Sequence, residues 1–491
     1  MTLNKYTIAA SSSKKRPDMT WKDHLVMLLH IGAEIEHSLM VQYLYAAYSL
    51  GGEQVLPLER RPMVRRWQEE ILVVAREEMG HLLTVQNILT LIGGSINLER
   101  VNLPWDIPFY PFPFKLEPVS LDSIACYLYA EMPSPREFAD ARKRSPGGKL
   151  LERYERFEKD DRANIIKCAK GRASKRGAHR VGSLYQQIVQ LLGDSTRIPD
   201  PVFRESTFPF QASSDDWGRG YQPRPQMLDA GGSLDGAAKV REASMPVVRQ
   251  AHVMVDRVAT RAQAVAALTA LSHQGEAPVL ATSETDEPSH FDRFLGIYQE
   301  YDALTDKDKW QPARPVPTNP ATLQDPDVPN DGYISRRHSQ EWASLFNLRY
   351  RMLLKYLAHT FRLARTMPGD TPNLRAMVMH RVFGEMYNLK TLAGILVRLP
   401  RRDAEADPAR AGPPFEIPYS LDLPDGELER WIRHRDLIRS SQRLCSKLAA
   451  HPHTNKSERA YLNALIGLDS QTDTWIGGIL AGLVTAERMA P

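Results

Sequence analysis

The chain is poor in cysteine, and several common sequence patterns are missing from it. Its 491 residues include 3 cysteines, at positions 126, 168 and 445, and none of them belongs to a CxxC pair. This spacing suggests neither a zinc ribbon nor a disulfide framework, and it fits a reducing compartment. Runs that alternate between polar and apolar residues, typical of β-strands, are missing too, as are internal repeats. We therefore expect a mainly α-helical protein of the cytoplasm.

A strong excess of one charge and long apolar runs are also missing. The net charge is +4, and two short basic runs, at residues 14–16 and 170–180, are typical of solvated loops. The first thirty or so residues lack the apolar core of a signal peptide. The longest apolar stretch, residues 475–486, is shorter than the about 20 residues that a membrane-spanning helix needs. We therefore expect no secretion, no membrane insertion and no nucleic-acid partner.

Helical periodicity is strong in the first part of the chain. Apolar residues recur at three- and four-residue steps over residues 21–50 and 62–92, which predicts two long helices in an antiparallel hairpin. A proline-rich crossover follows at residues 102–118, and its aromatic residues indicate that it lies packed on the surface. A short helix is predicted at residues 121–131.

The later periodicity predicts how the chain is divided into regions. Residues 133–241 are polar and irregular apart from one helical piece at 181–192, whereas helical patterns return at 254–276 and 290–301. Two more long helical patterns, after a second proline-rich linker, predict another hairpin. The predicted regions are a polar tail (1–20), a helical bundle (21–305) with an insertion (133–241), a linker and second hairpin packed on the bundle (306–400), and a C-terminal helical region (401–491).

Charged residues interrupt the apolar stripes at matching points. Glu36, Glu78, His81 and Glu131 all fall on core-facing positions. A buried ionised carboxylate is costly unless it is paired, protonated or bound to a metal. The spacing Glu78-x-x-His81 places a carboxylate and an imidazole on one helix face. A lone ExxH is common on helix surfaces, but this one follows a helix with a core Glu and precedes another, which favours a metal site.

The order of these residues matches that of ferritin-like bundles. Such bundles hold two irons with one Glu from each of two helices and a Glu-x-x-His from each of the other two, and a long crossover can join the second and third helices. Glu131 would then come from the third helix, and the candidates for the fourth are Glu276 and His290. These two are too far apart for one helical turn, so a loop must bulge out between them. The alternatives are a solvated helix end for Glu276 and an exposed helix start for His290.

Other charged residues near these positions have plainer interpretations. His37 follows Glu36 and cannot share its face, so it either supports a ligand or is structural. Glu34 and Glu77 are interpreted as solvated or salt-bridged, and Glu385 as a residue of a helix surface.

Several blocks of sequence resemble the ferritin-like domain of the iminophenyl-pyruvate dimer synthase family. They follow one another in order between residues 21 and about 417, at 34–44, 77–82, 129–133, 181–185, 274–276, 289–294, 346–347 and 412–416. The resemblance implies an all-α, ferritin-like four-helix bundle with long insertions and additional C-terminal helices. It also implies two iron ions, or another divalent transition metal, with dioxygen as co-substrate.

The function that the resemblance implies is a non-haem di-metal oxidoreductase. Such an enzyme would oxidise or couple a small amino-acid-derived or aromatic molecule in specialised metabolite biosynthesis, alone, as a homo-oligomer or with a partner enzyme of the pathway. Because one fold serves many reactions, two alternatives stay open. They are a ferroxidase or metal-handling protein, and a ferritin-like scaffold subunit without redox activity.

Overall fold

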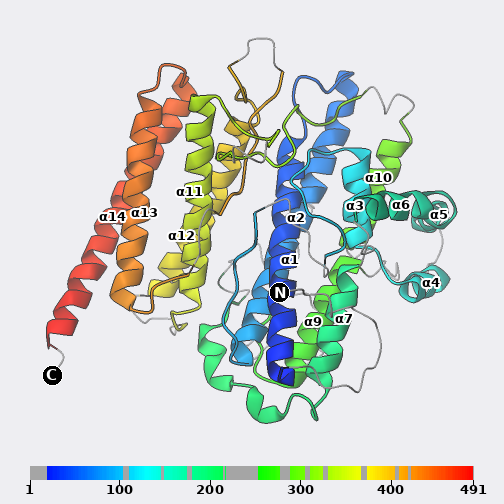
Figure 1. Cartoon of the computed structure of the whole chain (residues 1–491), viewed down its shortest axis with the longest axis horizontal. Coiled ribbons are helices and arrows are strands. Elements are labelled where there is room, and N and C mark those ends of the chain that lie inside the picture. Colours follow the sequence, from blue (N-terminus) through cyan, green and yellow to red (C-terminus); the bar gives the residue numbers. More distant parts are fainter. Residues whose placement is uncertain are drawn as a thin grey trace, which may run out of the picture. The chain divides into compact units, whose positions relative to one another are not determined.

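The protein is described here by a computed structural model. It describes residues 19–102, 110–144, 149–173, 180–213, 216, 253–276, 288–304, 310–324, 330–365, 373–403, 408–417 and 422–489. Within these ranges the structure has helices and isolated β-bridges but no β-strand (Figure 1). The predicted all-α fold class is therefore confirmed. The chain divides into two compact units, Met1–Arg314 and Pro315–Pro491.

The first unit is built on a hairpin of two long helices. These are α1 (Trp21–Ser49) and α2 (Arg61–Leu91), which pack against each other along the hairpin that the sequence predicts. The hydroxyl of Thr20 caps α1 by accepting a hydrogen bond from the amide of Asp23, at 3.1 Å. Pro62 lies in the first turn of α2, where its missing amide hydrogen removes no helical hydrogen bond.

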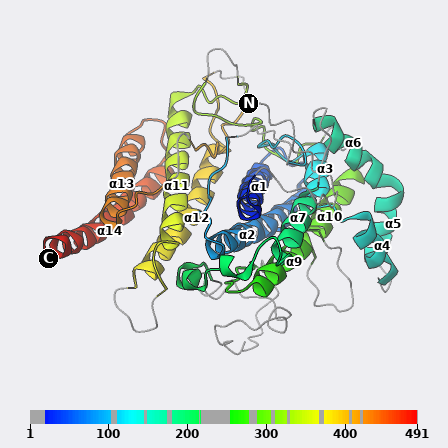
Figure 2. The same ribbon diagram turned by 60° about the horizontal axis from the view of Figure 1, so that its bottom comes forward.

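Four shorter helices complete the part of this unit that surrounds the hairpin. They are α3 (Leu121–Ala130), α7 (Val181–Gly193), α9 (Arg261–Glu276) and α10 (His290–Asp302). Figure 2, in which α1 is seen nearly along its axis, shows α2 and α7 beside it. Capping boxes at Ser120 and Ser289 fix where α3 and α10 begin.

The helix predicted at residues 254–276 begins later than expected, at Arg261. Side chains of α2 bind the preceding backbone instead: Thr84 donates to the carbonyl of Met254 at 3.3 Å, and Asn87 to that of Asp256 at 2.8 Å. The close approach requires Gly80, because a Cβ atom there would lie 2.6 Å from the carbonyl oxygen of Met254. These contacts hold the segment extended along α2 and set the position of α9.

The proline-rich crossover is more deeply buried than predicted. In its described part, the side chains of Tyr110, Phe112, Phe114 and Leu116 are all buried. Tyr110 stacks on Phe114 with 4.6 Å between the ring centroids. The described part of the crossover is therefore packed against the bundle, as its aromatic residues predict, and these residues also supply core volume.

The predicted insertion contains more helix than its polar sequence suggested. Besides α7, it forms α4 (Pro135–Arg144), α5 (Lys149–Arg156) and α6 (Arg162–Arg172). A few aromatic side chains are enough to fix α4 and α5, since Phe138 and Phe157 pack against Phe291 of α10. Through α6, Cys168 comes within 3.9 Å of Cys126 of α3, sulfur to sulfur, as a pair of free thiols.

The second unit contains α11 (Arg337–Thr360), α12 (Leu374–Leu396), α13 (Glu427–Ala449) and α14 (Lys456–Met489). Helices from both predicted regions, 306–400 and 401–491, belong to this unit, so the boundary predicted at 400 lies inside it. Glu385 is buried here and accepts a hydrogen bond from Arg349, which corrects its interpretation as a surface residue. In the described parts of both units, no helix is long and apolar enough to cross a membrane.

Candidate metal centre

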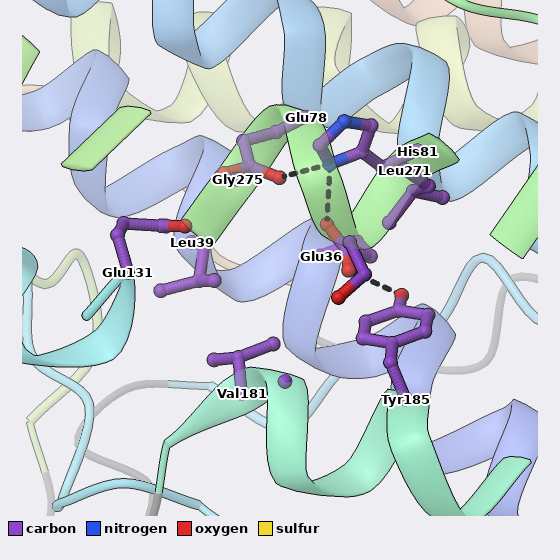
Figure 3. Close-up of a pocket in the computed structure, with 11 residues that line it drawn as sticks. Glu36, Leu39, Glu78, His81, Glu131, Val181, Tyr185, Leu271 and Gly275 are labelled. Carbon is purple, nitrogen blue, oxygen red and sulfur yellow. Dashed lines mark hydrogen bonds and ion pairs between the residues drawn. The ribbon is translucent and has the colours of Figure 1, made fainter. Parts of the chain in front are cut away.

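Three of the predicted ligands lie in the middle of the long helices. Glu36 of α1 faces Glu78 and His81 of α2, and all three side chains are almost fully buried. Nδ1 of His81 lies 3.0 Å from Oε2 of Glu78 and 3.4 Å from Oε2 of Glu36. Figure 3 shows these side chains pointing toward one another between the two helices. The i, i+3 spacing thus brings the carboxylate and the imidazole together as predicted.

Two further predicted ligands come from helix ends. Glu131 is the C-terminal cap of α3, and His290 is the first residue of α10. Nδ1 of His290 lies 3.1 Å from Oε1 of Glu78 and 3.6 Å from Oε2 of Glu131. His290 is completely buried, so the alternative of an exposed helix start does not hold.

The sixth predicted ligand, Glu276, is the last residue of α9. Its side chain lies outside the described residues. The preceding turn of α9 does reach the site: a Cβ atom on Gly275 would lie 3.1 Å from Oε2 of Glu131. The missing side chain at Gly275 therefore leaves room for the carboxylate of Glu131.

A second layer of side chains fixes the orientation of both imidazoles. Nε2 of His81 donates to Oε1 of Gln274 at 3.0 Å, and Nε2 of His290 donates to Oε2 of Glu77 at 3.0 Å. Because Nε2 of each ring is held by these acceptors, each Nδ1 faces the carboxylates and can bind a metal ion once it has lost its proton. This is the arrangement that metal-binding histidines use.

Two tyrosines form hydrogen bonds to the carboxylates of Glu36 and Glu131, which are called the outer carboxylates here. The hydroxyl of Tyr185 on α7 donates to Oε1 of Glu36, and that of Tyr43 on α1 donates to Oε1 of Glu131 at 2.5 Å. In each case the hydrogen bond leaves Oε2 of the carboxylate facing the histidine. Tyr43 is also packed between Tyr127 and Phe294, each 5.0 Å away between ring centroids.

Burial and mutual charge shift the pKa values of this cluster strongly. Burial, together with the charge of Glu78, raises the pKa of Glu36 to about 8. Burial acts to lower the pKa of His81, but the carboxylates of Glu36 and Glu78 outweigh it and raise the pKa to about 10. The pKa of His290 is likewise raised well above its usual value, because Glu78, Glu131 and Glu77 outweigh burial. The cluster thus attracts positive charge.

The donor atoms at the centre of the cluster fit a metal ion. Oε2 of Glu36, Oε1 of Glu78 and Nδ1 of His290 are buried, and no described residue gives them a hydrogen bond of good geometry. Ligand atoms of Glu78, His81 and His290 lie within 4.8 Å of one another. Buried donor atoms that converge without hydrogen bonds are costly unless a cation binds between them.

A pocket borders one side of this cluster. It has a volume of about 20 Å³, room for about one water molecule. The lining includes four charged residues of the cluster and seven others from α1, α7 and α9: Glu36, Glu78, His81, Glu131, Leu39, Val181, Gly182, Tyr185, Leu271, Ser272 and Gly275. Apart from Tyr185, the residues that line it beside the cluster are apolar or small.

Sequence reasoning missed four residues of the site. Glu77 is buried and paired with His290, which agrees with the salt-bridged alternative and excludes the solvated one but was not linked to the site; Gln274, Tyr43 and Tyr185 had no assigned hydrogen-bonding role. One signal was available, since Tyr43 lies seven residues after Glu36 and therefore on the same helix face. Gln274 and Tyr185 come from distant segments that spacing cannot relate to the site.

The two remaining predictions concern neighbours of the ligands on α1. His37 is fully buried and hydrogen bonds to the backbone of Leu98, in agreement with a structural role. Glu34 is half-buried and accepts a hydrogen bond from Asn97 at 2.9 Å.

Comparison with known proteins agrees with this geometry. Over 446 residues the chain is 25% identical to dichlorochromopyrrolate synthase of Lentzea aerocolonigenes, an alignment that covers 84% of this chain and 37% of that protein. The chain therefore spans little more than a third of the length of this relative. No solved structure matches the chain. A ferritin-like family model matches residues 29–299, more than half of the chain and every predicted ligand from Glu36 to His290, and the chain therefore belongs to the ferritin-like family.

Proposed function

We propose that the chain is a non-haem di-metal oxidoreductase. It would use two iron ions, or another divalent transition metal, and dioxygen to oxidise or couple a small amino-acid-derived or aromatic substrate in specialised metabolite biosynthesis. The observation that carries the proposal is the convergence of Glu36, Glu78, Glu131, His81 and His290 in a buried cluster, in which three central ligand atoms receive no hydrogen bond of good geometry from the described residues.

The charge of the cluster supports two divalent ions rather than one. Four buried carboxylates, from Glu36, Glu77, Glu78 and Glu131, carry up to four negative charges, which two divalent cations would balance. Glu78 lies between the two histidines, with Oε2 facing His81 and Oε1 facing His290. Mixed carboxylate and imidazole ligands suit iron and similar transition metals.

The residues of the chain divide the work of such a site. Glu36, Glu78 and His81 would hold one ion, and Glu78, Glu131 and His290 the other; when bound, the pair supplies binding and activation of dioxygen. Tyr43 and Tyr185 keep the outer carboxylates in place through their hydroxyl groups. These roles require rigid positions, which the second layer of hydrogen bonds provides.

The pocket favours an organic substrate over iron alone. Leu39, Val181 and Leu271 present apolar atoms beside the carboxylates, and such side chains exclude water from a reactive site. A ferroxidase site needs no apolar pocket for a second molecule. The free space of about 20 Å³ holds about one water molecule, so the apolar lining and not the volume carries this preference.

The similarity to dichlorochromopyrrolate synthase supports a role in biosynthesis. That protein is a synthase by name, and its similarity to this chain extends over 446 residues. Because the chain matches 37% of that protein, the substrate and the full reaction of the relative are not transferred.

Metal analysis tests the first half of the proposal. Protein purified from iron-supplemented medium should contain about two metal ions per chain. Glu78→Ala should lower this number to below one, and His81→Ala should lower it to about one. Glu34→Gln, two residues from Glu36 on the same helix but bonded to Asn97, is the matched control and should bind metal like the wild type. Less than one metal per chain in the wild type, unchanged by the two alanine substitutions, contradicts the proposal.

Dioxygen uptake tests the second half. A panel of aromatic amino acids and the imines derived from them is added to the iron-loaded protein in an oxygen electrode. We expect at least one member to accelerate dioxygen consumption, and Glu78→Ala to abolish the acceleration. Rapid oxidation of added ferrous ion with no acceleration by any organic molecule would instead favour a ferroxidase.

A further inference from the structure

The candidate metal centre consists of two halves in which the atoms that would bind metal are arranged alike. In the first half, Nδ1 of His81 faces Oε2 of Glu78 at 3.0 Å, and in the second, Nδ1 of His290 faces Oε1 of the same residue at 3.1 Å. Each half adds one outer carboxylate that a tyrosine holds in place. By these donor atoms alone, two metal ions would bind in equivalent positions.

The two halves differ in the group that accepts the hydrogen bond from Nε2 of the histidine. His81 donates to the neutral amide of Gln274, whereas His290 donates to the carboxylate of Glu77, and both hydrogen bonds are 3.0 Å long. A carboxylate behind an imidazole makes the ring a more basic ligand than an amide does. Glu77 also adds a full negative charge within reach of the second position.

The surroundings amplify this difference. His290 and Glu77 are 0% and 1% exposed, and within the described part of the chain the pocket is lined by His81 but not by His290. Tyr43, which holds the outer carboxylate of the second half, is packed among aromatic rings. Glu131 of the second half reaches the pocket, but His290 and Glu77 do not, and a charge acts more strongly in a buried environment than beside a pocket that water can enter.

We infer that Glu77 makes the two metal positions unequal. The position between Glu78, Glu131 and His290 takes up a divalent ion first and holds it more tightly, and the position between Glu36, Glu78 and His81 is the weaker and more exchangeable one, beside the pocket. This inference rests on the proposed function, because it requires that the site binds two ions. It makes Glu77 a positioning and charge-balancing residue that is not itself a metal ligand.

The reciprocal pair Glu77→Gln and Gln274→Glu tests the inference. Each substitution keeps a side-chain oxygen that can accept the hydrogen bond from Nε2, so that the main change is the charge behind one histidine. Metal-free full-length protein is titrated anaerobically with Co²⁺ alone, and binding is followed by calorimetry and visible absorption. Circular dichroism of each variant checks that the helices are intact.

We expect two resolved binding steps for the wild type. Glu77→Gln should weaken the tighter step by about 10- to 100-fold and change the weaker step by less than about 3-fold. Gln274→Glu should strengthen the weaker step, and the double variant should bind first at the His81 position. His290→Ala and His81→Ala, each lacking one histidine, assign the steps to positions.

A second measurement does not depend on any variant. Wild-type crystals with one equivalent of Co²⁺ should show the anomalous signal of cobalt beside His290 rather than beside His81. Two equal steps, a signal divided between both positions, or a Glu77→Gln variant that weakens both steps equally would overturn the inference but leave the di-metal proposal intact. A wild type that binds no metal would overturn both.

Discussion

The buried carboxylates of the second unit are paired with a cation of the protein itself, whereas those of the candidate metal centre in the first unit are not paired with a lysine or arginine of the described residues. In the second unit, Arg349 donates to Glu385 at 2.9 Å, to Asp469 at 2.5 Å and to the hydroxyl of Ser441 at 2.7 Å. Among the described residues, no lysine or arginine contacts Glu36, Glu78 or Glu131 in this way.

The difference explains what each cluster is suited for. A guanidinium group satisfies two carboxylates permanently, which makes the second cluster a structural feature of a helical unit. The carboxylates of the first cluster face imidazoles instead, and these lose their protons when a metal binds. Buried carboxylates alone therefore do not identify a metal site; the nature of the compensating cation does.

The largest loss of stability is expected when the internal cation of the second unit, Arg349, is removed. Arg349→Met should destabilise the second unit by about 3–5 kcal/mol, because it leaves two buried carboxylates without a partner. The free energy of unfolding in urea measures the effect. Arg439→Met is the control, since the partly exposed pair of Arg439 with Asp473 is worth at most about 1 kcal/mol. Equal effects of the two substitutions would show that the Arg349 cluster is not structural.

Added metal should stabilise only the first cluster. At a free metal concentration of 100 times the Kd, binding to the folded state adds about 2.7 kcal/mol to the free energy of unfolding. Thermal unfolding of the metal-free protein, with and without Co²⁺, measures this gain. Glu78→Ala should abolish the gain, and Arg349→Met should retain it despite its lower starting stability. A gain that persists in Glu78→Ala would point to metal binding elsewhere.

Removing one carboxylate should have opposite effects on the two clusters. Without metal at pH 7, Glu36→Gln should stabilise the protein by roughly 0.5–2 kcal/mol, because burial raises the pKa of Glu36 to about 8 and the amide avoids the cost of keeping this buried carboxyl group protonated. Glu385→Gln should destabilise it, because it removes a partner of Arg349. Urea unfolding in the presence of a chelator compares both variants with the wild type. Destabilisation by both substitutions would mean that the carboxylates of the first cluster are already compensated without metal.

The smallest expected effect concerns a partly exposed pair in the second unit, Glu427 and His359. Burial acts to raise the pKa of Glu427, but His359 and Arg430 outweigh it and lower the pKa to about 2. The folded state thus favours the ionised form, so this stabilisation is present above about pH 4.5 and is lost as the pH falls toward 2.

The measurement is the pH dependence of unfolding of Glu427→Gln. Its stability deficit relative to the wild type should be at most about 1 kcal/mol at pH 6 and should shrink toward zero below pH 4.5. Glu429→Gln, at an exposed position of the same helix, should show no such trend. A deficit that grows as the pH falls would contradict the assignment.

The sequence was most informative where function lies inside regular helices. The periodicity of α1 and α2 predicts both the hairpin and the meeting of Glu36 with Glu78 and His81, because a helix converts spacing into direction. The apolar stripe of the third helix adds Glu131, and the order of ligands in ferritin-like bundles adds His290; the structure brings both to the same cluster. Hydrophobic pattern and ligand spacing are local properties, and a single sequence displays them.

The parts that could not be predicted depend on contacts between distant segments. Glu77 is charged and adjacent to a ligand, so nothing in the sequence separates it from a solvated glutamate; its burial follows from where α10 begins. Arg349 and Glu385 likewise find each other across two helices of the second unit. The helices α4 to α6 were missed because a polar sequence with few aromatic residues gives weak periodicity.

The position of ligands at helix ends has a consequence for how this site can evolve. One residue inserted within α1 or α2 would turn the following side chains by about 100° and remove Glu36, Glu78 or His81 from the centre. Residues inserted between Glu276 and Ser289 change no helical register, because α10 starts afresh at His290 behind its own cap. Homologous chains should therefore vary in length between Glu276 and Ser289, while the two long helices keep their length. The ligands on the long helices would then keep their positions during evolution, whereas the segment that leads to His290 could change.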